Sequence, residues 1–134
     1  MSGNVIGIAA EKVLMAASAK TQTLLQAVAK AASEALAENL VAVDVSARLP
    51  FVEAFLLMTA DNSRHLRALV GAVTQEVREQ TGQSPHNVEG DNESTWLVID
   101  YQDVIVHVFL AESREFYALD QLWADVPRMG ISQN

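Results

Sequence analysis

The feature that most constrains the fold is a pair of apolar segments separated by only two polar residues. Trp96–Tyr101 and Val104–Leu110 are rich in β-branched and aromatic residues, and Gln102 and Asp103 alone stand between them. Segments of this length and composition favour β-strands. A two-residue connection between strands leaves room for a tight antiparallel hairpin and little else. The chain is therefore expected to build a sheet that includes this hairpin.

Helical patterns flank the predicted strands. Residues 8–39 are Ala-rich, with apolar residues at three- and four-residue steps, and Asn39 is the predicted stop of this helix. A second helix is expected after the capping residues Asp61–Ser63, with Gly82 placed to end it in a left-handed conformation. A third helix is expected near the C-terminus, with Ser113 as its cap. Its apolar face would consist of Phe116, Leu119, Leu122 and Trp123.

Shorter segments complete the predicted sheet. Leu40–Ser46 and Ala54–Thr59 indicate two buried strands, separated by a break at Arg48–Pro50. Ser84–Glu89 is expected to form a short edge strand, followed by a polar turn at Gly90–Ser94. The order α-β-β-α-β-β-β-α in 134 residues predicts one α/β (α+β) domain, a mixed sheet flanked by helices.

The acidic charge of the chain lies mainly in its last third. Seventeen acidic and nine basic residues give a net charge of −8. Between Glu89 and Asp125, Arg114 is the single basic residue among nine acidic ones. An acidic surface repels phosphate, so direct binding to nucleic acid or an anionic membrane is not expected. Two interpretations stay open: the charge attracts a basic protein partner, or it keeps a small domain soluble.

Sequence patterns also bear on the compartment. The chain has no cysteine, which removes disulfides and cysteine-ligated zinc. No apolar run reaches the roughly 18 residues that a membrane span requires. The start of the chain lacks the basic residues of a secretory signal. We therefore expect a cytoplasmic protein.

No catalytic motif is apparent. The sequence contains no phosphate-binding loop, no Gly-rich dinucleotide fingerprint and no nucleophile elbow. The histidines share no metal-ligand spacing: His65, His86 and His107. Asp44, Asp100 and Asp103 are the carboxylates that could hold a divalent cation, but we favour solvated turn carboxylates. No cofactor and no metal are expected.

The first strand of the hairpin carries an unusual mixture on one face. Strand alternation places Trp96, Val98 and Asp100 together, and Leu97, Ile99 and Tyr101 on the opposite face. A tryptophan beside an aspartate suits a contact surface, in which a large apolar anchor is bordered by charge. The alternative interpretation is that Trp96 covers the edge of the core.

Several segments resemble one known family. They are residues 38–46, residues 61–69, Val88-Glu-Gly90, the hairpin run from Trp96 to Phe109, and Arg114-Glu-Phe-Tyr-Ala-Leu-Asp-Gln-Leu-Trp123. In this order they are similar to the ribosomal silencing factor (Iojap) family. The resemblance covers roughly residues 20–128. It predicts a variable N-terminal extension (1–20), the family domain (21–128) and a C-terminal tail (129–134).

The resemblance implies a nucleotidyltransferase-like fold without transferase activity. It also implies binding to the large ribosomal subunit through ribosomal protein L-fourteen, which hinders joining of the small subunit and lowers translation when nutrients are short. A homodimer is implied as well. The implied contact residues are Trp96, Asp100, Tyr101, Asp103, His107, Arg114 and Tyr117.

Two departures from the family pattern accompany the resemblance. Val52-Glu53 stands where many members have Thr-Asp, and Gln102 stands where glycine is usual in the hairpin turn. Two other functions remain as alternatives. One is a divergent magnesium-dependent nucleotidyltransferase using Asp44, Asp100 and Asp103. The other is a homo-oligomeric scaffold in which Trp96 lies in the interface between copies.

Overall fold

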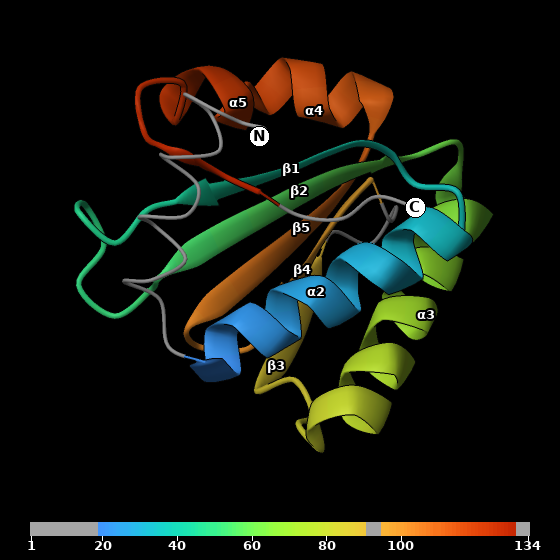
Figure 1. The fold of residues 1–134 in the computed structure, drawn as a ribbon. Helices are drawn as coiled ribbons and strands as arrows, with labels where there is room; N and C mark the ends of the chain where they lie inside the picture. The colour runs from blue at the N-terminus through green and yellow to red at the C-terminus, as the bar shows by residue number, and fades with distance from the viewer. Residues whose placement is uncertain (1–18, 91–94, 131–134) are drawn as a thin grey trace.

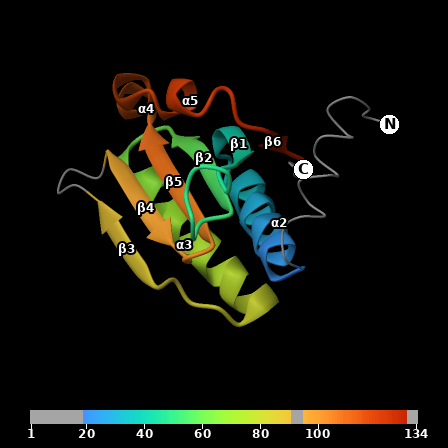
Figure 2. The same ribbon diagram turned by 90° about the vertical axis from the view of Figure 1, so that its left-hand side faces the viewer.

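The computed structural model describes residues 19–90 and 95–130 as a single sheet with helices on both sides. Figures 1 and 2 show α2 and α3 along one face of the sheet, and α4 and α5 over one end of the opposite face. The elements are α2 (Ala19–Glu34), β1 (Glu38–Asp44), β2 (Ala54–Ala60), α3 (Ser63–Thr81), β3 (Asn87–Gly90), β4 (Trp96–Asp100), β5 (Val104–Leu110), α4 (Ala111–Tyr117), α5 (Leu119–Leu122) and β6 (Arg128–Met129).

The sheet is mixed, with strand order β3-β4-β5-β2-β1-β6. β5 pairs in parallel with β2 and antiparallel with β4, and the other pairs of neighbours are antiparallel. The expected α+β class with a mixed sheet is therefore confirmed. β6 adds a strand that the sequence did not predict. Met129, which we assigned to the tail, pairs with Ala42 and is buried.

The larger core lies between the sheet and the pair α2 and α3. All seven residues of β2 are buried, which is the pattern of a central strand covered on both faces. α2 contributes small residues together with Leu24, Leu25 and Val28, and α3 contributes a stripe at helical spacing: Leu66, Leu69, Val73 and Val77. Because α2 is rich in alanine, it lies close to α3 and the sheet.

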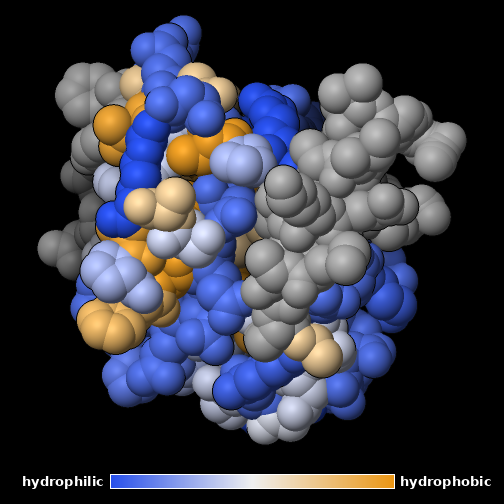
Figure 3. Space-filling model, turned by 60° about the vertical axis from the view of Figure 1, so that its left-hand side comes forward, coloured by the Kyte–Doolittle hydropathy of each residue, from blue (hydrophilic) through white to orange (hydrophobic). Residues whose placement is uncertain are grey.

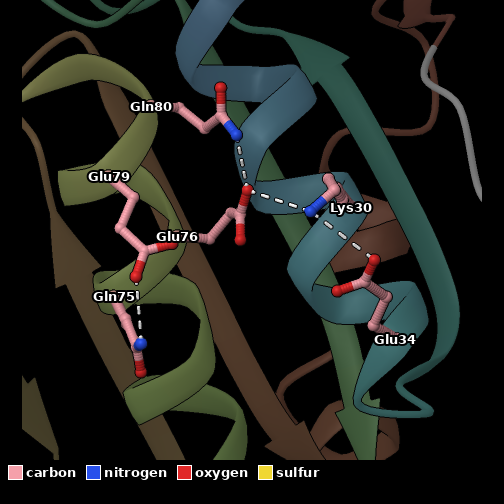
Figure 4. Close-up of polar contacts among 6 residues, drawn as sticks. All are labelled: Lys30, Glu34, Gln75, Glu76, Glu79 and Gln80. Atoms are coloured by element: carbon pink, nitrogen blue, oxygen red, sulfur yellow. Dashed lines mark hydrogen bonds and ion pairs between the residues drawn. The ribbon is translucent and has the colours of Figure 1, made fainter.

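Polar side chains join the outer surfaces of α2 and α3 (Figure 4). The Lys30 ammonium lies 3.2 Å from the Glu76 carboxylate and 3.5 Å from that of Glu34. The Gln80 amide donates a hydrogen bond of 2.8 Å to the same Glu76 oxygen. These donors, Gln80 first and then Lys30, hold the pKa of Glu76 below its ordinary value. The contacts fix the register between the helices, although exposed pairs of this kind contribute little stability.

The predicted ends of α3 are confirmed. The Asn62 side chain accepts a hydrogen bond of 2.8 Å from the backbone N–H of His65, so it caps the first turn. Gly82 adopts the left-handed conformation at φ 78° and closes the last turn through a bond to the Arg78 carbonyl. Both positions follow from ordinary capping chemistry, which is why the sequence identified them.

Other predicted ends were wrong. α2 ends at Glu34, with Leu36 in the left-handed conformation, whereas Asn39 already belongs to β1. Asn39 also has a positive φ, and it lies where the register of β1 against β2 shifts. Asparagine tolerates this conformation at a bulge as readily as at a helix end, so its identity alone could not separate the two.

The C-terminal helix is also different from the prediction. It is two short helices, α4 and α5, because Ala118 turns into the left-handed conformation at φ 55° between them. α4 begins after Leu110 without a side-chain cap, so Ser113 lies inside the helix. The predicted parts of the first helix before Ala19, the polar turn at 91–94 and residues 131–134 lie outside the described residues. In the described ranges, no helix has the length and apolar character needed to cross a bilayer.

The β4–β5 hairpin has the predicted tight turn despite the missing glycine. Tyr101 donates its N–H to the Val104 carbonyl at 2.9 Å, and Asp103 donates to the Tyr101 carbonyl at 3.0 Å. Gln102 lies between them at φ 74°, a conformation that glycine adopts without strain and other residues adopt at a cost. Gln102 is therefore a strained residue at a position that favours glycine.

Gln102→Gly should stabilise the protein. Relief of the left-handed strain outweighs the greater freedom of glycine in the unfolded chain, giving a net gain of about 0.5–1 kcal/mol. Chemical denaturation followed by circular dichroism measures this gain. Gly82→Ala, which introduces the same strain at the end of α3, should lower stability. A Gln102→Gly variant no more stable than the parent would contradict this account of the turn.

Candidate partner-binding face

The candidate site is the sheet face opposite α2 and α3, which we call the open face. Alternate residues of β2, β4 and β5 point to it, and α4 and α5 cover only part of it. Five ring side chains of this face form one cluster: Phe55, Trp96, His107, Phe109 and Trp123. The predicted alternation along β4 is confirmed, because Trp96 packs with this cluster while Ile99 and Tyr101 belong to the larger core.

Trp96 lies across the surface of the aromatic cluster. Its ring stacks on Phe109 with centroids 5.1 Å apart, and its Nε1–H donates a hydrogen bond of 3.2 Å to His107 Nδ1. Trp96 is half-buried, as are Val98, Asp100 and Ile105 beside it on the same face. The indole is therefore held in a fixed orientation with part of its surface in solvent. Such a side chain loses little conformational entropy on binding a partner.

His107 is the buried support beneath Trp96. Its Nδ1 accepts from the indole, so the neutral ring carries its proton on Nε2. Nε2 is buried and has no hydrogen-bond partner among the described residues. Burial lowers the pKa of His107 to about 4, so the ring is neutral at pH 7. Phe55 packs edge-on against it, with centroids 4.7 Å apart. His107 is therefore a structural histidine, and its packing and its bond to Trp96 account for its place in an apolar strand.

Apolar and polar surface alternate on this side of the molecule. Figure 3 shows orange, apolar surface gathered on the left, the side on which β4 and β5 lie, and interrupted there by blue, polar side chains. A large apolar group bordered by polar ones is the usual composition of a protein-binding surface. The open face therefore has the chemical character of a contact surface.

Asp100 and Asp103 lie at the turn end of the open face. Asp100 Oδ1 accepts a hydrogen bond of 2.7 Å from the backbone N–H of Gln102, which fixes the turn. The Asp103 carbonyl accepts from Glu53 and Ala54, at 2.7 and 3.2 Å, and ties the turn to the start of β2. The other end of this face carries Trp96. The predicted contact residues thus span the length of β4.

Two other predicted contact residues, Tyr101 and Arg114, do not present their side chains on the open face, and a third, Tyr117, is not placed. Tyr101 is buried in the larger core, on the opposite face of the sheet, and burial raises its pKa to about 12. A partner on the open face cannot touch it. Arg114 is bound inside the molecule, as described below. Tyr117 ends α4, and its side chain, like that of Phe116, lies outside the described residues.

Arg114 joins α4, α5 and the sheet. Its Nε and Nη2 donate to the two carboxylate oxygens of Asp120, each at 2.8 Å. Nη1 donates to the Asn39 carbonyl at 2.7 Å and to Thr59 Oγ1 at 2.9 Å. The bonds from Arg114 also hold the pKa of Asp120 below its ordinary value. The guanidinium thus positions α4 and α5 at the margin of the open face.

Two of the three carboxylates considered for a metal, Asp44 and Asp100, accept local hydrogen bonds. Asp44 Oδ1 accepts from the Ser46 N–H at 2.9 Å and the Ser46 hydroxyl at 2.6 Å. Within residues 19–90 and 95–130, no group of three or more acidic or histidine side chains is arranged to hold a metal ion.

Sequence reasoning missed Phe55 and Trp123 as members of the cluster. Trp123 packs on Phe55 with centroids 5.3 Å apart, and the Arg48 guanidinium lies 5.2 Å from the centroid of its ring. Alternation along Ala54–Ala60 could have placed Phe55 on a particular face. It could not have shown which face stays open, because that depends on where α4 and α5 pack.

The comparisons with known proteins define the class. The family model described as "Ribosomal silencing factor during starvation" matches residues 18–134. A ribosomal silencing factor RsfS from Halalkalibacterium halodurans is 31% identical over 110 residues, covering 82% of this chain and 93% of that protein. Similar structures are known. A Chromobacterium violaceum protein has a TM-score of 0.72 at 25% identity, covering 77% of this chain and 85% of that one. A Bacillus halodurans protein has a TM-score of 0.68 at 28% identity, covering 81% and 98%.

These matches place the chain among the non-enzymatic regulators that act on the ribosome. It belongs to the ribosomal silencing factor (RsfS, Iojap) family. The resemblance stated from the sequence is confirmed, and the nucleotidyltransferase alternative is not supported by the family.

His107 gives the protein a defined pH dependence. Its pKa is about 4 in the folded state and about 6.5 in an unfolded chain, so the unfolded state binds the proton more readily. Stability should be complete above pH 6.5 and fall by about 3 kcal/mol as the pH drops toward 4. Denaturant titrations between pH 7.5 and 4.5 measure this fall. His107→Gln can still accept from the indole but does not titrate. If that variant shows the same fall as the parent, another group is responsible.

Arg114→Lys tests the role of Arg114 as a positioning residue. A lysine ammonium cannot form the bidentate pair with Asp120 and also reach Asn39 and Thr59, so unfolding should require about 2 kcal/mol less. Thermal denaturation provides the measurement. Arg48→Lys, which alters the more exposed Arg48–Asp125 pair, should change stability by less. Equal effects of the two substitutions would count against this role.

Proposed function

We propose that this protein binds the large ribosomal subunit through ribosomal protein L-fourteen, with the open face as its docking surface. While bound, it hinders joining of the small subunit and so lowers translation when nutrients are short. The cytoplasm is the proposed location. The observation that carries the proposal is the half-buried indole of Trp96, which His107 holds on a sheet face that α4 and α5 leave partly uncovered (Figure 2).

The physical basis of affinity is the apolar surface around that indole. Trp96, Val98 and Ile105 are half-buried neighbours on β4 and β5, where Trp96 pairs with Phe109 and Val98 with His107. Removing such surface from water stabilises a complex by about 25 cal/mol per Å² before the costs of association. Because the side chains are packed from below, those costs are small.

Charge complementarity supports the proposed partner. Ribosomal proteins lie beside RNA phosphate and are commonly basic, whereas this chain carries a net charge of −8. Opposite net charge accelerates encounter and favours a protein surface over the RNA around it. A steric blocker requires affinity and bulk, and no catalytic group.

Two predicted contact residues take a different role in this proposal. Arg114 holds α4 and α5 at the margin of the open face, and Tyr101 anchors the hairpin from the opposite face. Trp96, Asp100 and Asp103 make direct contact, while His107 acts by orienting Trp96. Tyr117 remains a proposed contact residue from the family resemblance.

A second copy of the chain is the other candidate occupant of the open face. Its apolar centre is the observation that favours a homodimer, because two such faces could bury each other. The same net charge on both copies opposes this pairing, so the dimer should strengthen with salt while the ribosomal complex weakens.

Trp96→Ala and Val98→Lys should both weaken binding to large ribosomal subunits. We expect Trp96→Ala to cost about 2 kcal/mol, as truncation of a central aromatic does. Val98→Lys places a cation on the open face, opposite Glu89 on β3, where the fold accepts it. Sedimentation with purified large subunits measures the affinity.

Val88→Lys is the matched control. Val88 lies opposite Ile99 and thus on the other face of the same strand pair. Native circular dichroism is required of each variant. If Val88→Lys weakens binding as much as Val98→Lys, or if neither Trp96→Ala nor Val98→Lys has an effect, the open face is not the docking surface.

A further inference from the structure

A groove lies at the turn end of the open face, at the opposite end of β4 from Trp96. It has a volume of about 660 Å³ and opens to solvent. Pro50, Phe51 and Val52 of the β1–β2 loop line it together with Ile105, and Asp100 and Asp103 line it from the hairpin. Its size falls in the range of sites that take several side chains of a ligand.

The β1–β2 loop is held in place although it has no regular structure. Val45 donates its N–H to the Glu53 carbonyl at 3.1 Å, closing the loop at its base. Glu53 donates to the Asp103 carbonyl at 2.7 Å, which ties the loop to the hairpin turn. Arg48 forms an ion pair with Asp125 and donates to the Leu122 carbonyl, which ties it to α5.

This loop presents Phe51 with 86% of its surface exposed. Exposing an apolar side chain of this size to water is unfavourable, and burying it against a partner would relieve that cost. A phenylalanine has only two rotatable side-chain bonds, so ordering it on binding costs little conformational entropy. Phe51 is therefore a candidate for a side chain that a binding partner buries.

Among the described residues that line the groove, the charged side chains are acidic. They are Glu53, Asp100 and Asp103, and none of the described lining residues is a lysine or arginine. Arg48, the nearest cation along the loop, is paired with Asp125. A groove lined by both apolar side chains and carboxylates selects a ligand that combines positive charge with an apolar side chain. A second copy of this acidic chain has the wrong charge for it.

We infer that this groove binds a lysine- or arginine-bearing segment of the partner protein, with an apolar side chain of that segment packed between Phe51 and Ile105. The inference rests on the proposed function and extends it, because it adds a second contact about one strand length from Trp96. Two separated contacts fix the orientation of a bound partner, which a steric blocker requires.

A peptide titration tests the groove without the ribosome. The probe is a blocked pentapeptide in which lysine alternates with leucine and phenylalanine, and its control replaces lysine with glutamate. In amide NMR spectra the lysine peptide should shift residues 50–53 and 100–105, and about 0.5 M salt should remove the shifts. Asp103→Lys should abolish them. Equal shifts with the glutamate peptide, shifts elsewhere, or none at all would overturn the inference.

Binding to large subunits separates this inference from the proposed function. Phe51→Ser and Asp103→Lys should each weaken binding about tenfold. Leu36→Asn, which removes another exposed apolar side chain at a left-handed position between α2 and β1, should not. If Trp96→Ala weakens binding but these two variants bind like the parent, the groove is not used and the proposed function stands. If the parent does not bind at all, the proposed function fails, and the peptide titration alone decides the groove.

Discussion

The two pairings of β5 are the constraint on which the rest of the structure depends. β5 pairs in parallel with β2 and antiparallel with β4, so it joins the β1–β2 half of the sheet to the β3–β4 half. Its alternate residues also supply both cores, Val104, Val106 and Val108 on one face and Ile105, His107 and Phe109 on the other. Stability and surface chemistry therefore come from one strand, and the hairpin cannot shift register without disturbing the core.

Unequal covering of the two faces leaves part of one sheet face available for the binding that we propose. α2 and α3 are long enough to cover one face, whereas α4 and α5 together reach only part of the other. Arg114 fixes where that partial cover stops, and His107 fixes the indole that remains outside it. The family membership supplies the ribosome as the place of action. The role that we propose for the open face is binding through apolar and acidic side chains, which requires no catalytic group.

The sequence predicted those features whose cause is local. Asn62 and Gly82 bound α3 through capping geometry, and the two residues between β4 and β5 require a hairpin. Features that depend on contacts between residues far apart in the sequence were missed or placed wrongly. Hydrogen bonds from Arg114 to Asp120 and to Thr59 of the sheet stabilise the break between α4 and α5 at Ala118. β6 forms because Met129 pairs with Ala42, which is distant in the sequence. For the site, alternation placed Trp96 and Asp100 together correctly. The resemblance, and not alternation, made Tyr101 and Arg114 predicted contact residues, and Arg114 was also favoured by the mixed polar and aromatic residues around it. Tyr101 is buried and Arg114 is paired with Asp120 because of packing that no local sequence pattern contains.

A structure of the chain bound to the large ribosomal subunit by electron cryo-microscopy tests the central claim most directly. The account predicts that the open face lies against a basic ribosomal protein, with Trp96 and Ile105 within about 4 Å of its side chains. It would be contradicted if the chain touched the subunit through α2 and α3 while the indole remained in solvent.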